Sequence, residues 1–526
     1  MKKILCIFIA MLMMVTSLCI TPIGAAKQLY SYRVLDDNTV EILRYNGKDT
    51  VVKIPETIDS MPVTSLGHAA FYTCNDVTEV TIPQSVTSIG TRAFDGCESL
   101  KTINIPETVE FIDDMAFYYC SALENITLPY GIESIGEMAF CRCYNLKQLT
   151  IPDSVKTIGE YAFLDCNALE NVTMSKNLET IGPSAFSGCK ALKEITLPDT
   201  LKSIEHRAFY NCKSLTSIHI PSNVSSISFD VFSYCDSIEQ ITVNENNNFF
   251  DARNNSNALI ETKTNKLLRG CTDTIIPESV VEIGTAAFTN RKFETIEIPD
   301  SVTKIGREAF RYCENLKEIT LPENLETVSE YMFSECINLE TVNFGNVTYI
   351  SEYAFYKCEK LTNVKLPKNL RSIGWGAFTN CKSLTELTLP RATQTTGYYA
   401  FDGSALTDLY VLNPMCHIMV DGLIYPPCPS MPLSTVIYGY ENSLAQSYAQ
   451  EFGNEFVVLD EYILGDADSD GEVSVMDASL IQMYLVGEKE ISDEAFFAAD
   501  ADCDSEISVL DASLIQMYLV GKMELG

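Results

Sequence analysis

The chain has 526 residues, 46% of them hydrophobic, which is too long for one ordinary domain and sufficient to bury several cores. Its formal net charge of -34 excludes a nucleic-acid polyphosphate as the expected partner, because like charges repel. Such a charge is typical of a soluble protein in a calcium-rich extracellular setting.

Residues 1–26 have the pattern of a secretory signal peptide. Two lysines near the start precede an apolar run at residues 4–20, and a Gly-Ala-Ala sequence supplies a small-residue cleavage site. The run is short for a membrane-spanning anchor, and a lipoprotein signal would need a small residue where Leu18 precedes Cys19. We therefore expect removal of this segment and secretion of the protein.

Residues 27–55 are predicted to form an N-terminal β cap. The stretches YSYRVL and TVEILRY alternate apolar and polar side chains, as half-buried strands do. Turn-forming residues Asp36, Asp37 and Asn38 separate the two stretches, and an Asn46-Gly47 turn follows the second.

A unit of 22 or 23 residues then repeats, most clearly in IPQSVTSIGTRAFDGCESLKTINIP. Its phenylalanine recurs at Phe71, Phe94, Phe117, Phe140, Phe163, Phe186, Phe209, Phe232, Phe288, Phe310, Phe333, Phe355, Phe378 and Phe401. This period, with the pattern C-x-x-L-x-x-I-x-I-P, predicts a leucine-rich-repeat solenoid. The pattern resembles the BspA-like (Treponema pallidum type) repeat family over roughly residues 50–412, and we place the solenoid at 56–412.

Each repeat is expected to form one coil that cannot fold alone. In one coil the inward-facing side chains are predicted to be Leu100, Ile103, Ile105, Val109, Ile112, Ala116 and Phe117. Burial of about five large apolar groups contributes roughly 1.5 to 3 kcal/mol each before entropy is subtracted. Stacking of neighbouring coils therefore makes the core continuous.

Two segments depart from the repeat. Residues 241–274 contain an asparagine-rich turn followed by ALIETKTNKLL, which predicts a β-hairpin excursion that is a tolerated irregularity more than a binding loop. Residues 413–460 begin with a proline-rich stretch and continue as STVIYGYENSLAQSYAQEFGNEFVVL. We interpret the second segment as strand, helix and strand, forming a cap over the last coil.

The C-terminal segment, 464–526, contains two copies of an acidic loop followed by DASLIQMYLVG. Oxygen ligands fall at loop positions 1, 3, 5, 7, 9 and 12, the schedule of a calcium loop. In the first copy these are Asp466, Asp468, Asp470, the backbone carbonyl of Glu472, Ser474 through a water, and Asp477. In the second copy they are Asp500, Asp502, Asp504, Glu506, Ser508 and Asp511. Clustered carboxylates repel one another unless a hard cation lies among them, so two Ca²⁺ ions are expected.

The loops differ from an EF-hand at two positions. Position 12 is aspartate, and Ser505 occupies position 6 of the second loop, where Gly471 makes the sharp turn of the first. Ser505 is expected to weaken the second site. The short distance from the strand-like FVVLD to Asp466 leaves no room for an entering helix, so each copy should be a loop plus one exiting helix.

This pair resembles a type I dockerin, the module that attaches bacterial proteins to cohesin domains of cellulosome-type scaffolds. The resemblance implies cohesin contacts at loop positions 10 and 11 and on the helix. Carried onto this chain, they are Val475, Met476, Gln482, Met483, Gly487, Val509, Leu510, Gln516, Met517 and Gly521.

The residues themselves agree with this assignment. In the first helix Leu480, Ile481, Tyr484 and Leu485 form an apolar stripe that can be core. Val475, Met476 and Met483 are then left facing water, which suggests a partner surface. Because residues 477–487 and 511–521 are identical, we expect two interchangeable binding orientations.

Cysteine lies three residues after the repeat phenylalanine at Cys74, Cys97, Cys120, Cys143, Cys166, Cys189, Cys212, Cys235, Cys313, Cys336, Cys358 and Cys381. An even dozen in a secreted protein invites a disulfide interpretation. A small buried side chain that bonds the turn backbone fits this repeat position better, so we expect free thiols. We expect a disulfide only between Cys416 and Cys428.

Candidate catalytic groups are few. The histidines His68, His206, His219 and His417 have no zinc-like spacing, and no phosphate loop, nucleophile elbow or paired-carboxylate scaffold is recognisable. We predict that the chain is not an enzyme.

One exposed strand position per repeat forms a polar column: Thr81, Asn104, Thr127, Thr150, Thr173, Thr196, His219, Thr242, Glu297, Thr320, Asn343, Lys365, Thr388 and Tyr410. A column of this length could hold an extended protein or glycan. Threonine is also a good strand former, and aromatic platforms are nearly absent from the column, so we favour strand propensity as its explanation.

The sequence thus predicts a mainly β protein: a right-handed leucine-rich-repeat stack with β caps and a small α-helical calcium-binding dockerin. Its expected role is that of a secreted, non-catalytic binding or adhesion protein on a cohesin-bearing scaffold at or near the cell surface. The alternatives are a scaffold-borne hydrolase and a regulator of neighbouring enzymes.

Overall fold

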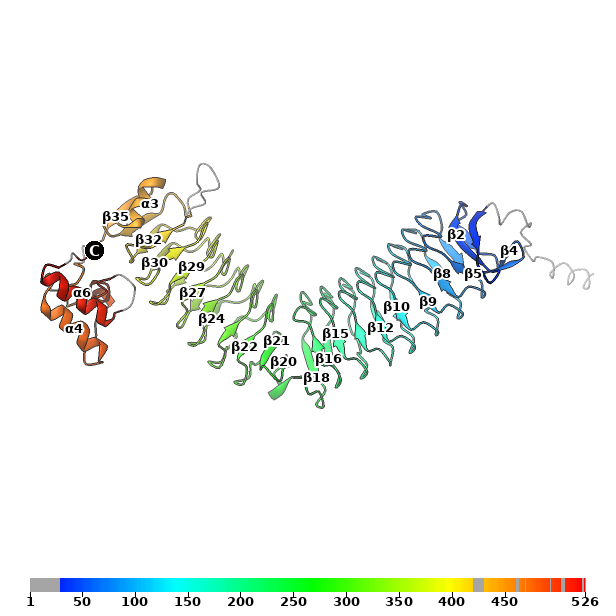
Figure 1. Ribbon diagram of the computed structural model, residues 1–526, viewed down its shortest axis with the longest axis horizontal. Coiled ribbons are helices and arrows are strands. Elements are labelled where there is room, and N and C mark those ends of the chain that lie inside the picture. The colour runs from blue at the N-terminus through cyan, green and yellow to red at the C-terminus, as the bar shows by residue number, and fades with distance from the viewer. Residues whose placement is uncertain are drawn as a thin grey trace, which may run out of the picture. The chain divides into compact units, whose positions relative to one another are not determined.

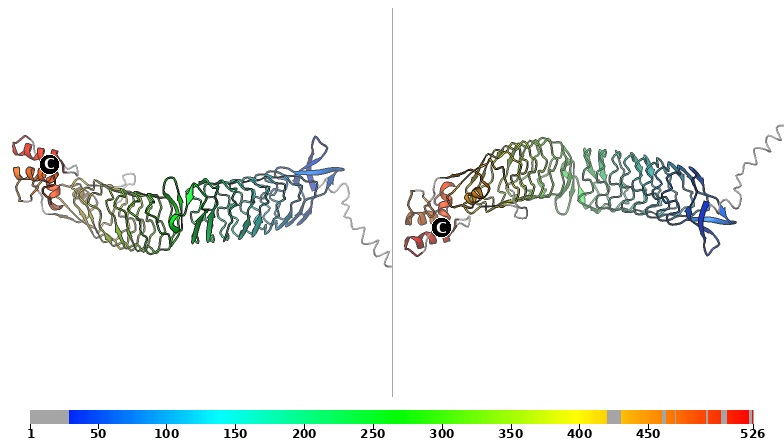
Figure 2. Two further views of the ribbon diagram at one scale, coloured as in Figure 1. Left: turned by 90° about the horizontal axis from the view of Figure 1, so that it is seen from below. Right: turned by 90° about the horizontal axis from the view of Figure 1, so that it is seen from above.

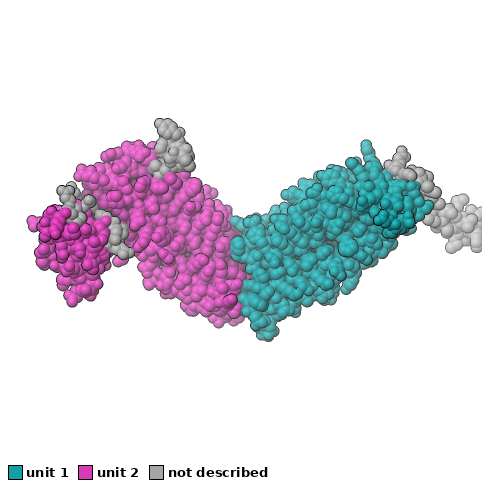
Figure 3. Space-filling model, viewed as in Figure 1, with its two compact units in different colours: residues 1–252 teal, residues 253–526 magenta. Residues whose placement is uncertain are grey.

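The computed structural model describes residues 29–419, 430–459, 463–468, 470–491, 493–502, 507–522 and 525. The described chain divides into two compact units, within residues 1–252 and 253–526 (Figure 3). The predicted signal peptide, Cys428, Asp504, Ser505 and Glu506 lie outside the described residues. Among the residues described, no helix combines the length and apolarity that a membrane crossing requires.

The first unit opens with an antiparallel pair, β1 (Tyr30–Val34) and β2 (Val40–Tyr45), as predicted. From β2 onward the coils of this unit pair in parallel, one upon the next, apart from one short antiparallel pair (Figure 1). One sheet continues through β5 (Met61–Leu66), β7 (Ser88–Ile89) and β9 (Phe111–Ile112), with β4 (Thr57–Ile58) paired to β5. The neighbouring sheet contains β3 (Val51–Lys53), β6 (Glu79–Thr81) and β8 (Thr102–Asn104).

Later coils of this unit repeat the arrangement in two rows of short parallel strands. One row contains β10 (Ser134–Ile135), β12 (Thr157–Ile158), β14 (Thr180–Ile181), β15 (Ser203–Ile204) and β17 (Ser226–Ile227). The other contains β11 (Gln148–Thr150) with β13 (Asn171–Thr173), and β16 (Ser217–Ile220) with β18 (Gln240–Val243). The unit ends at β19 (Phe250–Asp251).

The second unit begins with a 3₁₀ turn (Arg253–Asn255) and the predicted hairpin, β20 (Ala258–Glu261) and β21 (Lys266–Gly270). Strand β21 then pairs in parallel with β22 (Glu282–Ile283), which pairs with β23 (Lys304–Ile305). The hairpin therefore leads directly back into the stack. Views along two further directions show the coils of each unit following one another in sequence order (Figure 2).

Three further rows complete the repeat region and its cap. They are β24 (Glu318–Thr320), β26 (Thr341–Asn343) and β28 (Asn363–Val364); β25 (Thr327–Val328), β27 (Tyr349–Ile350), β29 (Ser372–Ile373), β31 (Thr395–Thr396) and β33 (His417–Ile418); and β30 (Glu386–Leu389), β32 (Asp408–Val411), β34 (Val436–Gly439) and β35 (Phe456–Val458). Helix α3 (Leu444–Phe452) lies between β34 and β35, so the predicted order of strand, helix and strand is confirmed.

The repeat phenylalanines form a continuous stack inside each unit. Their side chains are almost completely buried, and consecutive rings lie nearly parallel, with centroids 5.0 Å apart for Phe71 and Phe94 and 6.1 Å apart for Phe378 and Phe401. Tyr45 begins the stack, at 5.2 Å from Phe71. Parallel pairing and ring stacking therefore already start inside residues 27–55, where only a cap was expected.

The repeat cysteines are free thiols, as predicted. From the second coil on, each donates a hydrogen bond to the carbonyl of the phenylalanine 25 or 26 residues earlier; the Cys166 Sγ to Phe140 O distance is 3.2 Å. The thiol thus satisfies a buried backbone acceptor between coils. Cys416 is also a buried free thiol, and its expected disulfide partner, Cys428, lies outside the described residues.

The C-terminal module consists of α4 (Val475–Leu485), α5 (Asp493–Ala499) and α6 (Val509–Leu519). Helices α4 and α6 pack against each other, and their equivalent residues form its core: Ala478 with Ala512, and Ile481 with Ile515. Helix α5 was not predicted. The fold class expected from the sequence, a β solenoid with β caps and a small helical module, is confirmed.

Candidate metal loops and binding surfaces

The first acidic loop brings three carboxylates together. Oxygen atoms of Asp466, Asp468 and Asp470 lie within 4.8 Å of one another. Backbone amides fix their orientation: Asp466 accepts from the N–H groups of Asp470 at 3.0 Å and Gly471 at 2.9 Å, and Asp470 accepts from Glu472 at 2.9 Å. The loop therefore presents oxygen ligands that its own backbone has already oriented.

Asp477, the predicted ligand at position 12, joins this loop to helix α4. Its buried carboxylate accepts from Asp468 N at 3.0 Å and from Ser474 N at 2.7 Å. Ser474 is the N-cap of α4, and its hydroxyl accepts from Met476 N at 2.9 Å. The Ser474 side chain also accepts from the Asp477 backbone while the Asp477 carboxylate accepts from Ser474 N, which forms a capping box. One side chain thus couples the shape of the loop to the start of the helix.

The second loop repeats this arrangement in its described part. Oxygen atoms of Asp500, Asp502 and Asp511 lie within 4.8 Å of one another. Asp511 accepts from Asp502 N at 3.2 Å and from Ser508 N at 2.7 Å, and Ser508 caps α6. The hydrogen bonds around position 12 are therefore the same in both copies.

The donor set fits a calcium ion. All side-chain donors are oxygen atoms, and most are carboxylates, which hard divalent cations prefer. Burial, together with the nearby carboxylates of Asp477 and Asp470, raises the pKa of Asp468. A divalent cation would neutralise the repulsion among these carboxylates.

Each helix also exposes an apolar patch, and all ten predicted cohesin contacts lie on the surface. Val475 and Met476 are 65% and 64% exposed, and their counterparts Val509 and Leu510 are 68% and 54% exposed. Neither pair has a structural reason to face water.

The structure adds two residues to these patches and removes one from the predicted core. Val486 and Val520, just beyond the ends of α4 and α6, are 70% and 66% exposed. Leu485 was assigned to the core stripe but is exposed, because α4 buries only Ala478, Ile481 and Asp477 fully. The other three residues of the predicted stripe, Leu480, Ile481 and Tyr484, do pack in or against the core of the module.

The polar column of the repeats lies on the surface, with most of its side chains exposed. His219 and Thr242 contact each other along it, with 2.9 Å between Nδ1 and Oγ1. At its C-terminal end the Tyr410 ring stacks on Tyr438 with centroids 4.4 Å apart, and Tyr438 donates to Asp408. The column thus ends in an aromatic pair whose second ring comes from the cap.

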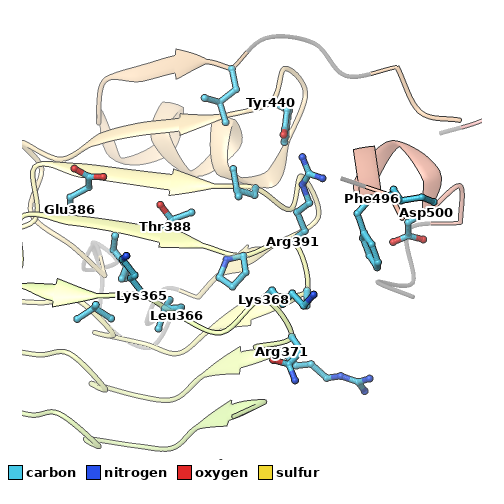
Figure 4. A pocket seen from close by; sticks show the side chains of 18 of the residues that line it. Lys365, Leu366, Lys368, Arg371, Glu386, Thr388, Arg391, Tyr440, Phe496 and Asp500 are labelled. Atoms are coloured by element: carbon cyan, nitrogen blue, oxygen red, sulfur yellow. The ribbon is translucent and has the colours of Figure 1, made fainter. Parts of the chain in front are cut away.

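A groove of about 1450 Å³ runs beside the last coils of the second unit (Figure 4). Lys365, Lys368, Arg371 and Arg391 line it from the repeats, and Phe496 and Asp500 of the helical module also contribute. Lys365, Lys368 and Arg371 come from one stretch of seven residues, and Arg391 comes from the following repeat. The groove was not predicted from the sequence.

The histidines and acidic residues of the repeats make surface contacts between coils. His206 Nδ1 lies 2.9 Å from Asp230, which also pairs with Arg207 at 3.2 Å. Among the described residues, the groups of three or more side chains that could share one metal ion are those of the two loops.

Comparison with known families matches two regions. Residues 50–170, 156–266, 254–360 and 281–408 match the family described as BspA type leucine-rich repeat region. Residues 464–520 match the family described as dockerin type I domain. Neither match is to a catalytic domain, and none of the curated proteins compared matches the chain.

Solved structures resemble the repeat region. A leucine-rich cell surface protein from Faecalibacterium prausnitzii is 31% identical, with 68% of this chain and 92% of that chain covered and a TM-score of 0.54. A leucine-rich repeat protein from Bacteroides ovatus is 28% identical, with 82% and 98% covered and a TM-score of 0.50.

Proposed function

Because the chain belongs to the BspA-type leucine-rich-repeat family and carries a C-terminal type I dockerin, we propose that it is a secreted, non-catalytic binding protein. The dockerin attaches it to a cohesin domain of a cellulosome-type scaffold. The repeat region contacts protein or polysaccharide in the surroundings of that scaffold.

The observation that carries this proposal is the duplicated loop and helix. In both copies a buried aspartate, Asp477 or Asp511, accepts hydrogen bonds from the loop and from the helix N-cap. Bound calcium would neutralise the clustered carboxylates and hold each loop closed. The buried aspartates then transmit loop closure to α4 and α6, which carry the exposed apolar patches.

The two patches have nearly the same composition and face solvent from helices that pack against each other. A half-turn about the axis between α4 and α6 would exchange them. The proposal therefore includes two equivalent orientations on one cohesin, with α4 or α6 as the main contact.

The test measures cohesin binding by the full chain, with calcium and with a chelator. Replacing Val475 and Met476 by Asp, or Val509 and Leu510 by Asp, removes one orientation and should weaken binding only about twofold, roughly 0.4 kcal/mol. The fourfold variant should lose binding, and so should the native chain with chelator. The matched control places the same two charges on exposed positions of the polar column in the first unit, Thr150→Asp together with Thr196→Asp, and should bind cohesin as the native chain does.

Two results would contradict the proposal. Undiminished capture of cohesin in the presence of chelator would exclude attachment through calcium. Loss of binding on changing one pair alone would exclude interchangeable orientations while leaving attachment itself intact.

A further inference from the structure

Four consecutive coils of the second unit carry aromatic side chains in the turn before the buried phenylalanine. Tyr331 follows β25, Tyr353 follows β27, Trp375 follows β29 and Tyr399 follows β31. The ring centroids of Tyr331 and Tyr353 lie 5.1 Å apart, those of Tyr353 and Trp375 6.1 Å apart, and those of Trp375 and Tyr399 6.4 Å apart. These four residues form an unbroken row along the stack, called here the aromatic ladder.

The fold does not require aromatic residues at this position. The equivalent turn in the first unit holds Arg92, Met115, Met138, Tyr161 and Ser184, a single isolated aromatic among them, with the same left-handed backbone at φ between 52° and 57°. Tyr331, Tyr353 and Tyr399 adopt φ of 52° to 55°, a conformation that is unfavourable for bulky side chains. The coil geometry is thus indifferent to the side chain, so the aromatic run needs another explanation.

The coil between Tyr353 and Tyr399 shows how the row is kept continuous. Gly376 takes the left-handed position there, with φ of 59°, and a Cβ atom on it would lie 2.5 Å from Cε1 of Tyr353. Glycine therefore leaves room for the Tyr353 ring. The aromatic group comes from the preceding residue, Trp375, which is the single tryptophan of the chain and is 43% exposed.

The two arginines beside the first ring of the ladder are paired with glutamates. Arg307 lies over the Tyr331 ring at 5.2 Å and pairs with Glu330 at 3.4 Å. Arg311 lies at 5.2 Å from the same ring and pairs with Glu308 at 3.6 Å. Positive charge at this end of the ladder is therefore balanced by carboxylates, which disfavours polyphosphates and polyuronates as ligands.

The geometry suits a linear, neutral polymer. Parallel strands lie about 4.8 Å apart, close to the length of one sugar residue in an extended chain. The faces of the Tyr331 and Tyr353 rings are turned toward each other, at 8°, so these residues offer a polymer their edges and hydroxyl groups. Trp375 is tilted by 34° from Tyr353 and is 43% exposed, so its indole can take the C–H face of a sugar. Protein hot spots instead gather at the centre of a compact patch surrounded by further contacts, unlike a row one residue wide.

We propose that the aromatic ladder binds an extended neutral polysaccharide running along the stack, with Trp375 as its main stacking platform. This inference rests on the proposed function, because it names the ligand class of the repeat region and the residues that hold it. It places glycan contact in the turns instead of on the polar strand column.

The experiment uses the full chain in affinity electrophoresis with soluble xylan, soluble mixed-linkage β-glucan or polygalacturonate. Trp375 fluorescence is followed in solution titrations with the same polymers, since the chain has no other tryptophan. At least one neutral polymer should retard the protein and shift its fluorescence. Trp375→Ala and Tyr353→Ala should each weaken binding at least tenfold, and Trp375→Tyr should retain most of it.

The matched control is Tyr130→Ala, which removes an exposed tyrosine of the first unit and should leave retardation unchanged. No retardation by either neutral polymer, equal retardation of Trp375→Ala, or binding confined to polygalacturonate would overturn the inference. So would a protein ligand that is lost on Trp375→Ala without any glycan binding. Cohesin capture, measured on the same samples, shows separately whether attachment to the scaffold stands.

Discussion

At the scale of single residues, the two calcium loops differ most at position 6. Gly471 has a φ of 92°, and a Cβ added to it would meet nothing within 4 Å. Glycine is therefore not required at position 6 for lack of space. It is required for the left-handed backbone conformation, which residues with a Cβ strongly disfavour.

Replacing Gly471 by Ser should therefore weaken calcium binding by the first loop. Backbone strain of about 1–3 kcal/mol corresponds to roughly a tenfold to hundredfold loss of affinity. Calcium titration of the full chain by calorimetry measures this change. The reciprocal variant Ser505→Gly should tighten the second site, and an unchanged affinity in both variants would mean that position 6 does not set the turn.

Other residues show what the sequence alone could and could not reveal. The ligand positions and exposed apolar pairs follow from spacing, because loop and helix are local structures. The aromatic ladder does not, because its rings meet only when coils stack, and Trp375 is displaced by one residue from its neighbours. Tyr45 was missed for a similar reason, since it begins the ring stack without the repeat pattern around it.

At the scale of elements, the period of 22 or 23 residues predicted one coil per repeat and its inward-facing side chains, but not the second row of short strands, such as β9 and β12. The hairpin at β20 and β21 was predicted from its asparagine-rich turn and alternating side chains. Helix α5 was not predicted because it is short and lies in the segment between the two loop-and-helix copies, and only those copies were assigned a structure. Leu485 was misplaced because an apolar stripe of four residues does not define a helix face to within one position.

The buried repeat cysteines should make the stability of the folded chain depend on pH. Burial raises the pKa of Cys313 from an ordinary value of 9.0 to about 12 and places that of Cys166 well above its usual range. In the unfolded chain these thiols ionise near the ordinary value. The folded state then holds more protons than the unfolded state, so stability is full below this pH and falls as pH rises through the window up to the folded pKa.

We therefore expect the free energy of unfolding to decrease between about pH 9 and about pH 11, by up to about 1.4 kcal/mol per pH unit for each buried thiol. Chemical denaturation at several pH values measures it. Tyrosine and lysine also titrate there, so the comparison is with Cys313→Ala, whose slope should be shallower. Equal slopes would mean that Cys313 ionises in the folded chain.

At the scale of the whole molecule, the chain combines two kinds of construction. The repeat units are built from contacts between neighbouring coils, such as the backbone hydrogen bonds from Lys156 N to Glu133 O and from Lys202 N to Glu179 O. The dockerin depends on ligand atoms gathered within a few residues. Calcium removal should therefore act on the second kind and leave the coils intact.

The stacked construction makes a prediction about deletions. Removing residues 141–163 deletes one 23-residue step and brings Phe140 into register with Phe186. This deletion removes both the stabilising burial of one coil and the entropy cost of ordering it. The free energy of unfolding should therefore fall by about the average of 0.05–0.15 kcal/mol for each deleted residue, or roughly 1–3 kcal/mol in all. Removing only residues 141–145 leaves the rest of that coil to be ordered while displacing Phe163 from the stack, which should cost about 3–5 kcal/mol or more. Denaturation midpoints of the two variants provide the measurement, and equal losses would mean that the coils do not behave as exchangeable units.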